Sequence, residues 1–124
     1  MENYGNGLTG VQLYHYNKQK YRDIAIVTLL LGTGIRVSEC VGLNISDVDF
    51  KNNGIRVLRK GGNEMVVYFG LEVEAALKDY LELSRNKITP LSGHENALFL
   101  SGQRKRISVD AIEKMVKKYS SAIS

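Results

Sequence analysis

Two cationic side chains of this sequence stand beside glycines that break the chain. Arg36 comes directly after Gly32-Thr33-Gly34-Ile35, and Lys60 comes directly before Gly61-Gly62. A guanidinium offers paired donors in a fixed fork that can hold two oxygens of one phosphate, whereas a lysine amine reaches out on a flexible stem. Residues of these two types at turns indicate a phosphate-binding site.

Two neighbours bear directly on that site. Glu39 stands three residues after Arg36, on the same face of a helix, where it can orient the arginine. The alternative is a solvated surface ion pair of little energetic value. Arg59 competes with Lys60 for its role, and both have the alternative of being exposed cations in an ordinary basic turn.

A second basic turn, which ends at residue 106, adds three candidate DNA-contacting cations. It either contacts phosphates or is only solvated. Its members are Arg104, Lys105 and Arg106.

Other reactive residue types are interpreted as structural. Tyr119 falls on the apolar stripe of a helix, so it is not expected to act as a nucleophile. His15 and His94 each stand alone, which predicts no metal site. Cys40 is the single cysteine and is expected to be a plain buried thiol, because no disulfide can form within the chain.

The elements that position these residues follow from the pattern of apolar positions. An unbroken run from Tyr21 to Leu31 predicts a buried helix, which Gly32-Thr33-Gly34 ends. A short second helix carries Arg36 and Glu39 and stops near Gly42. Alternation then predicts three short antiparallel strands, with Lys60 at the tip of the second hairpin. The inward positions are Val48, Phe50, Ile55, Val57, Met65, Val67 and Phe69.

Two further helices complete the predicted domain. One runs from Leu71 to about Asn86 and is expected to pack across the sheet. The other begins after Ser108 as N-cap, with a hydrophobic staple between Ile107 and Ile112. Its predicted buried stripe consists of Val109, Ile112, Val116 and Tyr119.

The chain of 124 residues is therefore predicted to hold a flexible, Gly/Asn-rich lead-in over 1–19 and one domain over 20–124. The fold class is α+β, mainly helical with a small three-stranded antiparallel sheet. A net charge of +4 favours polyanionic partners. The longest apolar stretch is far shorter than the roughly 20 residues of a membrane span. These features favour a cytoplasmic protein with a polyanionic partner and no membrane partner.

Three segments resemble motifs of the tyrosine recombinase (phage integrase) family. The segment 32–39, GTGIRVSE, resembles the first active-site motif, and 57–64, VLRKGGNE, resembles the β-hairpin lysine motif. LFLS over 98–101, the basic turn and Ile107-Ser108 follow in the family's order. The resemblance covers about Tyr21 to Tyr119 and implies catalytic roles for Arg36 and Lys60, with Glu39 in support.

The resemblance also implies a reaction on double-stranded DNA, and not on a small molecule, by several copies of a bacterial or phage-derived recombinase. A tyrosine hydroxyl attacks the phosphodiester and forms a 3′-phosphotyrosyl link, and Lys60 acts as general acid towards the leaving 5′-oxygen. Because the link conserves the bond energy, the reaction needs no cofactor or metal. The His-x-x-Arg motif and the nucleophile are not found in this sequence, so the chain is expected to be a partial catalytic domain, inactive alone.

Two alternatives stay open from the residues themselves. The chain could be a non-catalytic DNA-binding module on the same scaffold. It could also be a helical interaction domain whose basic charge serves only solubility.

Overall fold

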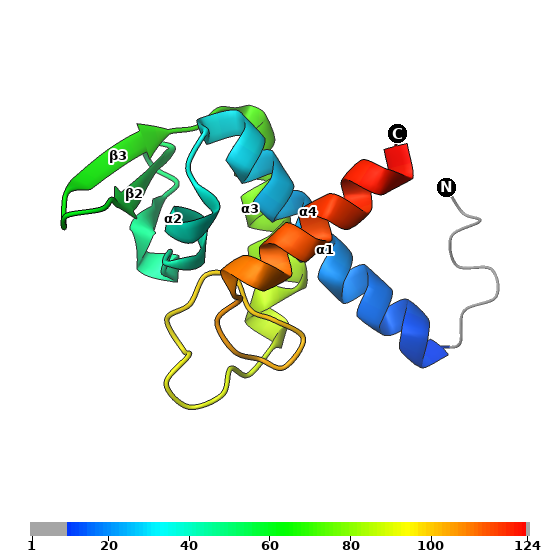
Figure 1. Ribbon diagram of the computed structural model, residues 1–124. Coiled ribbons are helices and arrows are strands. Elements are labelled where there is room, and N and C mark those ends of the chain that lie inside the picture. Colours follow the sequence, from blue (N-terminus) through cyan, green and yellow to red (C-terminus); the bar gives the residue numbers. More distant parts are fainter. Residues whose placement is uncertain (1–9, 124) are drawn as a thin grey trace.

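The computed structural model describes the backbone of residues 10–123 and the side chains of 19–119. The long helices α1 (Gly10–Thr33), α3 (Leu71–Leu83) and α4 (Val109–Ile123) cross one another, and a small sheet lies at one end beside the short helix α2 (Val37–Val41) (Figure 1). Single 3-10 turns occupy Ile45–Asp47 and Arg85–Lys87. The predicted α+β class is confirmed.

Helix α1 is longer than the sequence pattern predicts. It begins at Gly10, so residues 10–19 are helical and the expectation of a flexible lead-in over them is corrected; residues 1–9 lie outside the described range. Once the buried part of a helix exists, each added residue gains a hydrogen bond without a new nucleation cost. The helix ends as predicted, where Gly34 takes a φ of +73° that few other residues tolerate.

The three predicted strands are present in a single antiparallel sheet. They are β1 (Val48–Asp49), β2 (Gly54–Leu58) and β3 (Glu64–Tyr68), in the order β1-β2-β3. Ile55 pairs with Val67 and Val57 with Met65, as the alternation requires. Ile55 and Val57 are fully buried in the core, whereas the other face of the sheet is open to solvent.

Helix α3 packs mainly along α1, and the predicted packing across the sheet is wrong. Its buried residues Val73, Leu77 and Tyr80 join one core with those of α1. The helices approach so closely that a Cβ on Gly32 would lie 2.6 Å from Cγ2 of Val73. Helix α1 offers a larger apolar surface than a sheet with one two-residue strand, which explains the preference.

Helix α4 starts as predicted but buries a different stripe. The hydroxyl of Ser108 accepts a 3.0 Å hydrogen bond from the N–H of Ala111, and Ile112 is buried. Met115 is also buried, whereas Val116 and Tyr119 are about two-fifths exposed. The predicted stripe is therefore corrected: α4 packs against α2, which selects the face of Ile112 and Met115.

No helix in the described part of the chain is long and apolar enough to cross a membrane.

Candidate phosphate-binding site

Arg36 is the residue that opens helix α2. It has extended backbone angles, φ −80° and ψ 155°, and its side chain is exposed. Its backbone N–H donates a 2.8 Å hydrogen bond to Oε1 of Glu39. The contact of Glu39 with Arg36 is thus with the backbone of Arg36: the carboxylate caps the start of the helix, and the Arg36 side chain is exposed.

The second oxygen of Glu39 connects this helix to the hairpin. Oε2 lies 3.5 Å from Nε of Arg59, and the Glu39 side chain is only 8% exposed. One carboxylate thus contacts the residue before α2 and a residue at the tip of the β2–β3 hairpin. The structure brings Arg36, Glu39 and Arg59 together.

Lys60 follows Arg59 at the exposed tip of that hairpin. The turn is closed by hydrogen bonds from the N–H of Arg59 to the carbonyl of Asn63, 2.7 Å, and from the N–H of Gly62 to the carbonyl of Arg59, 3.1 Å. Gly61 and Gly62 have φ values of +87° and +83°, a conformation that glycine adopts at little cost. The tip that carries Lys60 is therefore joined through Arg59 to the helix that Arg36 opens.

A hollow of about 440 Å³ lies between α2 and the sheet, but it is not basic. Its charged lining consists of Glu39, Asp47, Glu64 and Arg56, and Arg56 pairs with Asp47 at 3.2 Å. Three carboxylates against one guanidinium repel a phosphate. The hollow is therefore unsuited to a phosphate, and neither Arg36 nor Lys60 is part of its lining.

The second basic turn divides into two parts. Arg104 and Lys105 are exposed, and Arg104 donates to the carbonyl of Thr89 at 3.2 Å. Arg106 is half-buried and faces inward, with hydrogen bonds to the carbonyls of Val41, 3.0 Å, and Leu43, 2.8 Å. The expectation of a DNA contact is corrected for Arg106, because its guanidinium caps the carbonyl end of α2.

Two of the residues that the sequence analysis set aside, His94 and Tyr119, have structural partners, whereas the side chain of His15 lies outside the described range. His94 accepts a 3.0 Å hydrogen bond at Nδ1 from the backbone N–H of Arg106. The hydroxyl of Tyr119 donates to the carboxylate of Asp23 at 3.2 Å, and Asp23 also pairs with Arg22 at 2.7 Å. Sequence reasoning missed this pair on α1, since adjacent opposite charges give no signal of burial.

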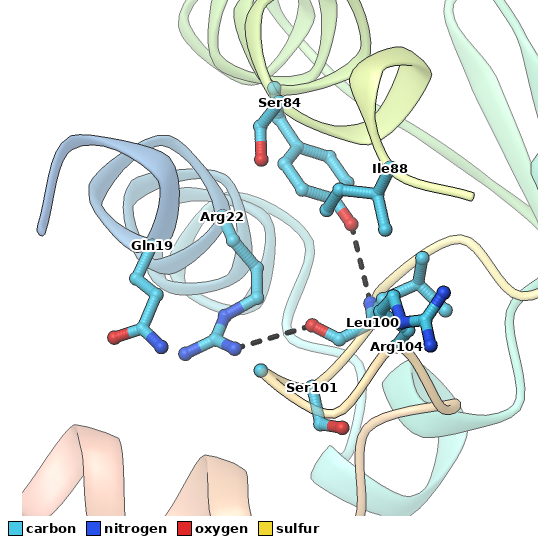
Figure 2. A pocket seen from close by; sticks show the side chains of 9 residues that line it. Gln19, Arg22, Ser84, Ile88, Leu100, Ser101 and Arg104 are labelled. Atoms are coloured by element: carbon cyan, nitrogen blue, oxygen red, sulfur yellow. Dashed lines mark hydrogen bonds between the residues drawn. The ribbon is translucent and has the colours of Figure 1, made fainter. Parts of the chain in front are cut away.

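A separate cavity of about 210 Å³ lies between α1, the end of α3 and the turn after Leu100. Figure 2 shows that Arg22 donates to the carbonyl of Leu100, a hydrogen bond of 3.2 Å. The backbone N–H of Leu100 donates to the hydroxyl of Tyr80 at 3.3 Å. Burial raises the pKa of Tyr80 to about 12. These groups hold the loop to the helices and leave few free donors for a ligand.

Among the described residues, no three His, Cys, Asp or Glu side chains gather as a metal-binding group. Cys40 is fully buried, and desolvation raises the pKa of its thiol to about 12. It is therefore a poor nucleophile.

The sequence pattern of the phage integrase family matches residues 10–123. The chain belongs to this family. The match starts at the first residue of α1 and so includes residues that the motifs alone had left out.

The family's tyrosine recombinases are similar over almost the whole chain. The tyrosine recombinase XerS of Streptococcus agalactiae serotype III is 39% identical over 120 residues, which is 94% of this chain and 33% of that protein. Among solved structures, the XerA recombinase superposes with a TM-score of 0.74 at 34% identity, over 83% of this chain and 36% of that one. The chain thus spans about a third of the relatives' length.

A second solved relative is a complex with DNA. The Tn1549 transposon integrase, in complex with circular intermediate DNA, superposes with a TM-score of 0.60 at 25% identity. The similarity covers 93% of this chain and 44% of that one. It supports the recombinase fold for α1 through α4.

Proposed function

We propose that this chain supplies the first arginine and the hairpin lysine of a site-specific tyrosine recombinase. Arg36 holds the non-bridging oxygens of the scissile phosphate, where negative charge builds in the transition state. Lys60 protonates the leaving 5′-oxygen. Arg59, Arg104 and Lys105 are exposed and contact neighbouring phosphates.

One observation carries this proposal: Glu39 joins the start of α2 to the hairpin tip. Its two oxygens reach the N–H of Arg36 at 2.8 Å and Nε of Arg59 at 3.5 Å. The connection brings the backbone of Arg36 and the guanidinium of Arg59, the residue before Lys60, to one carboxylate, which supports one phosphate shared by Arg36 and Lys60. The family membership supports the reaction, in which a tyrosine forms a 3′-phosphotyrosyl link while several copies of the whole protein act on double-stranded DNA.

These 124 residues alone bind duplex DNA weakly, with little sequence preference, and do not cut it. The binding is tested by measuring the duplex affinity at two salt concentrations. We expect the affinity to fall steeply as salt rises, because cations on the protein displace counterions from phosphates. No binding at low salt, or an affinity that does not change with salt concentration, would favour a helical interaction domain without a nucleic-acid role.

A matched pair of double variants separates a specific site from general charge. Arg36→Ala with Lys60→Ala should weaken binding by about tenfold or more relative to Lys87→Ala with Lys114→Ala, which removes the same charge elsewhere. Equal losses in the two double variants would contradict the site.

Cleavage is tested with a nicked duplex and a denaturing gel. We expect no covalent protein–DNA adduct, because no tyrosine of this sequence follows a His-x-x-Arg motif and the hydroxyl of Tyr119 is bonded to Asp23. An adduct formed by the chain would overturn the proposal that these residues bind DNA without cutting it.

A further inference from the structure

We propose that Arg59 is a positioning residue, which holds the hairpin tip against α2 through Glu39 so that Lys60 and Arg36 meet the same phosphate. The inference rests on the proposed function and deepens it. It gives Arg59 a task in addition to direct contact with DNA.

Apolar packing does not hold the hairpin tip. Leu58, the last residue of β2, is 64% exposed, and all residues from 59 to 66 are exposed. The strand pairing fixes the shape of the hairpin but not its distance from α2. Among the ion pairs between described residues, Arg59–Glu39 is the one that joins the tip to this helix.

The geometry of Glu39 makes it a suitable anchor. Its side chain is 8% exposed, so its attraction to Arg59, which is 43% exposed, is less screened than that of an open surface pair. Its other oxygen is held by the N–H of Arg36, so the carboxylate is not free to follow a moving hairpin. The position of the Arg59 guanidinium is therefore set relative to the backbone of Arg36.

Because Lys60 is the next residue after Arg59, fixing Arg59 also fixes the backbone of Lys60. Reactions of bound groups are sensitive to displacements of about 1 Å, so a small movement of the tip separates the amine from a phosphate held by Arg36. Loss of the Arg59–Glu39 ion pair should thus remove the coupling between Arg36 and Lys60 without unfolding the protein.

A simpler role for Arg59, direct contact with a phosphate, makes a different prediction. If Arg59 only attracts DNA, Glu39→Gln should strengthen DNA binding by removing a negative charge. It should leave the energetic coupling between Arg36 and Lys60 unchanged. If Arg59 positions the tip, Glu39→Gln and Arg59→Gln should both remove the energetic coupling between Arg36 and Lys60, although they change the net charge in opposite directions.

The experiment is a double-mutant cycle on duplex affinity, carried out with the 124-residue chain. Arg36→Ala, Lys60→Ala and their combination are measured in the parent chain and in the Arg59→Gln, Glu39→Gln and Arg56→Gln backgrounds. In the parent chain we expect the effects of Arg36→Ala and Lys60→Ala on the dissociation constant to be non-additive by about threefold or more. Arg59→Gln and Glu39→Gln should each make them additive.

Arg56→Gln is the matched control. Arg56 lies on the same hairpin and pairs with a carboxylate at a similar distance. Its partner is Asp47, which lies outside α2. The coupling should survive in this background. Coupling that persists after Arg59→Gln and Glu39→Gln, or that Arg56→Gln removes as well, would overturn the role of Arg59.

A second measurement is independent of DNA. Nitroxide labels at Ser38→Cys and Lys60→Cys report the separation of α2 from the tip, and the buried Cys40 does not compete for the label. We expect a narrow distance distribution that broadens in the Arg59→Gln and Glu39→Gln variants. An unchanged distribution contradicts the inference.

The two measurements also separate this inference from the proposed function. If Arg36 and Lys60 show no coupling in the parent chain, the shared phosphate is refuted, and the label distances still decide whether Arg59 holds the tip.

Discussion

The guanidinium of Arg106 donates a 2.8 Å hydrogen bond to the carbonyl oxygen of Leu43, just beyond the end of α2. It also bonds the carbonyl of Val41 and the side chain of Asn44. Helix α2 has only five residues and carries Glu39. Its orientation therefore depends on a residue that follows it by more than sixty positions in the chain.

Arg106→Ala should lower the free energy of unfolding by about 2–3 kcal/mol, because it removes the charged donor of the Val41 carbonyl at the end of α2, although the carbonyl of Leu43 keeps its 3.0 Å hydrogen bond from the N–H of Leu98. Urea unfolding of the purified chain measures this. Arg104→Ala, a change at an exposed neighbour, should stay within about 0.5 kcal/mol of the parent. A stable Arg106→Ala protein with strongly reduced DNA affinity would instead restore the original prediction of a phosphate contact.

Gly32→Ala should destabilise the protein, although alanine normally favours a helix. The added methyl group would lie 2.6 Å from Cγ2 of Val73, so α1 and α3 have to separate. We expect a loss of about 1–3 kcal/mol in thermal or urea unfolding. Val73→Ala in the same chain should recover part of that loss, whereas equal stability of parent and Gly32→Ala would show that the helices can move apart freely.

The buried thiol of Cys40 should make the fold sensitive to alkali. Its pKa is about 12 in the folded protein and 9.0 in an unperturbed thiol, so the unfolded state releases the proton first as pH rises. The stabilisation is complete below pH 9 and is lost between pH 9 and about 12. Between about pH 8 and about pH 10.5 the parent should lose about 2 kcal/mol more unfolding free energy than Cys40→Ala. Equal losses in the two proteins would show that the thiol is accessible to water.

Local patterns were sufficient to predict most of the fold. Glycines marked the end of α1, alternation indicated the three strands, and Ser108 indicated the start of α4. The partners of helix faces were less predictable. Helix α3 packs on α1 and not on the sheet, and α4 buries Met115 and not Val116. Both outcomes depend on which surfaces the rest of the fold makes available.

The candidate site shows the same division. Arg36 and Lys60 were predicted from residue type, glycine context and resemblance to family motifs, all of which are local features of the sequence. The Glu39–Arg59 ion pair and the inward position of Arg106 were not found, because each partner lies 20 or more residues away. In a sequence alone, three adjacent cations look equivalent, and only packing distinguishes Arg106 from Arg104.

The most direct test of a shared phosphate uses a dinucleoside monophosphate, which carries a single phosphodiester. NMR signals of the Arg36 guanidinium and the Lys60 amine are followed as this compound is added to the chain. Both signals should shift along one binding curve with the same dissociation constant, and Arg36→Ala should abolish the shift at Lys60. If only one of them responds, or if the two curves differ, Arg36 and Lys60 do not act on one phosphate.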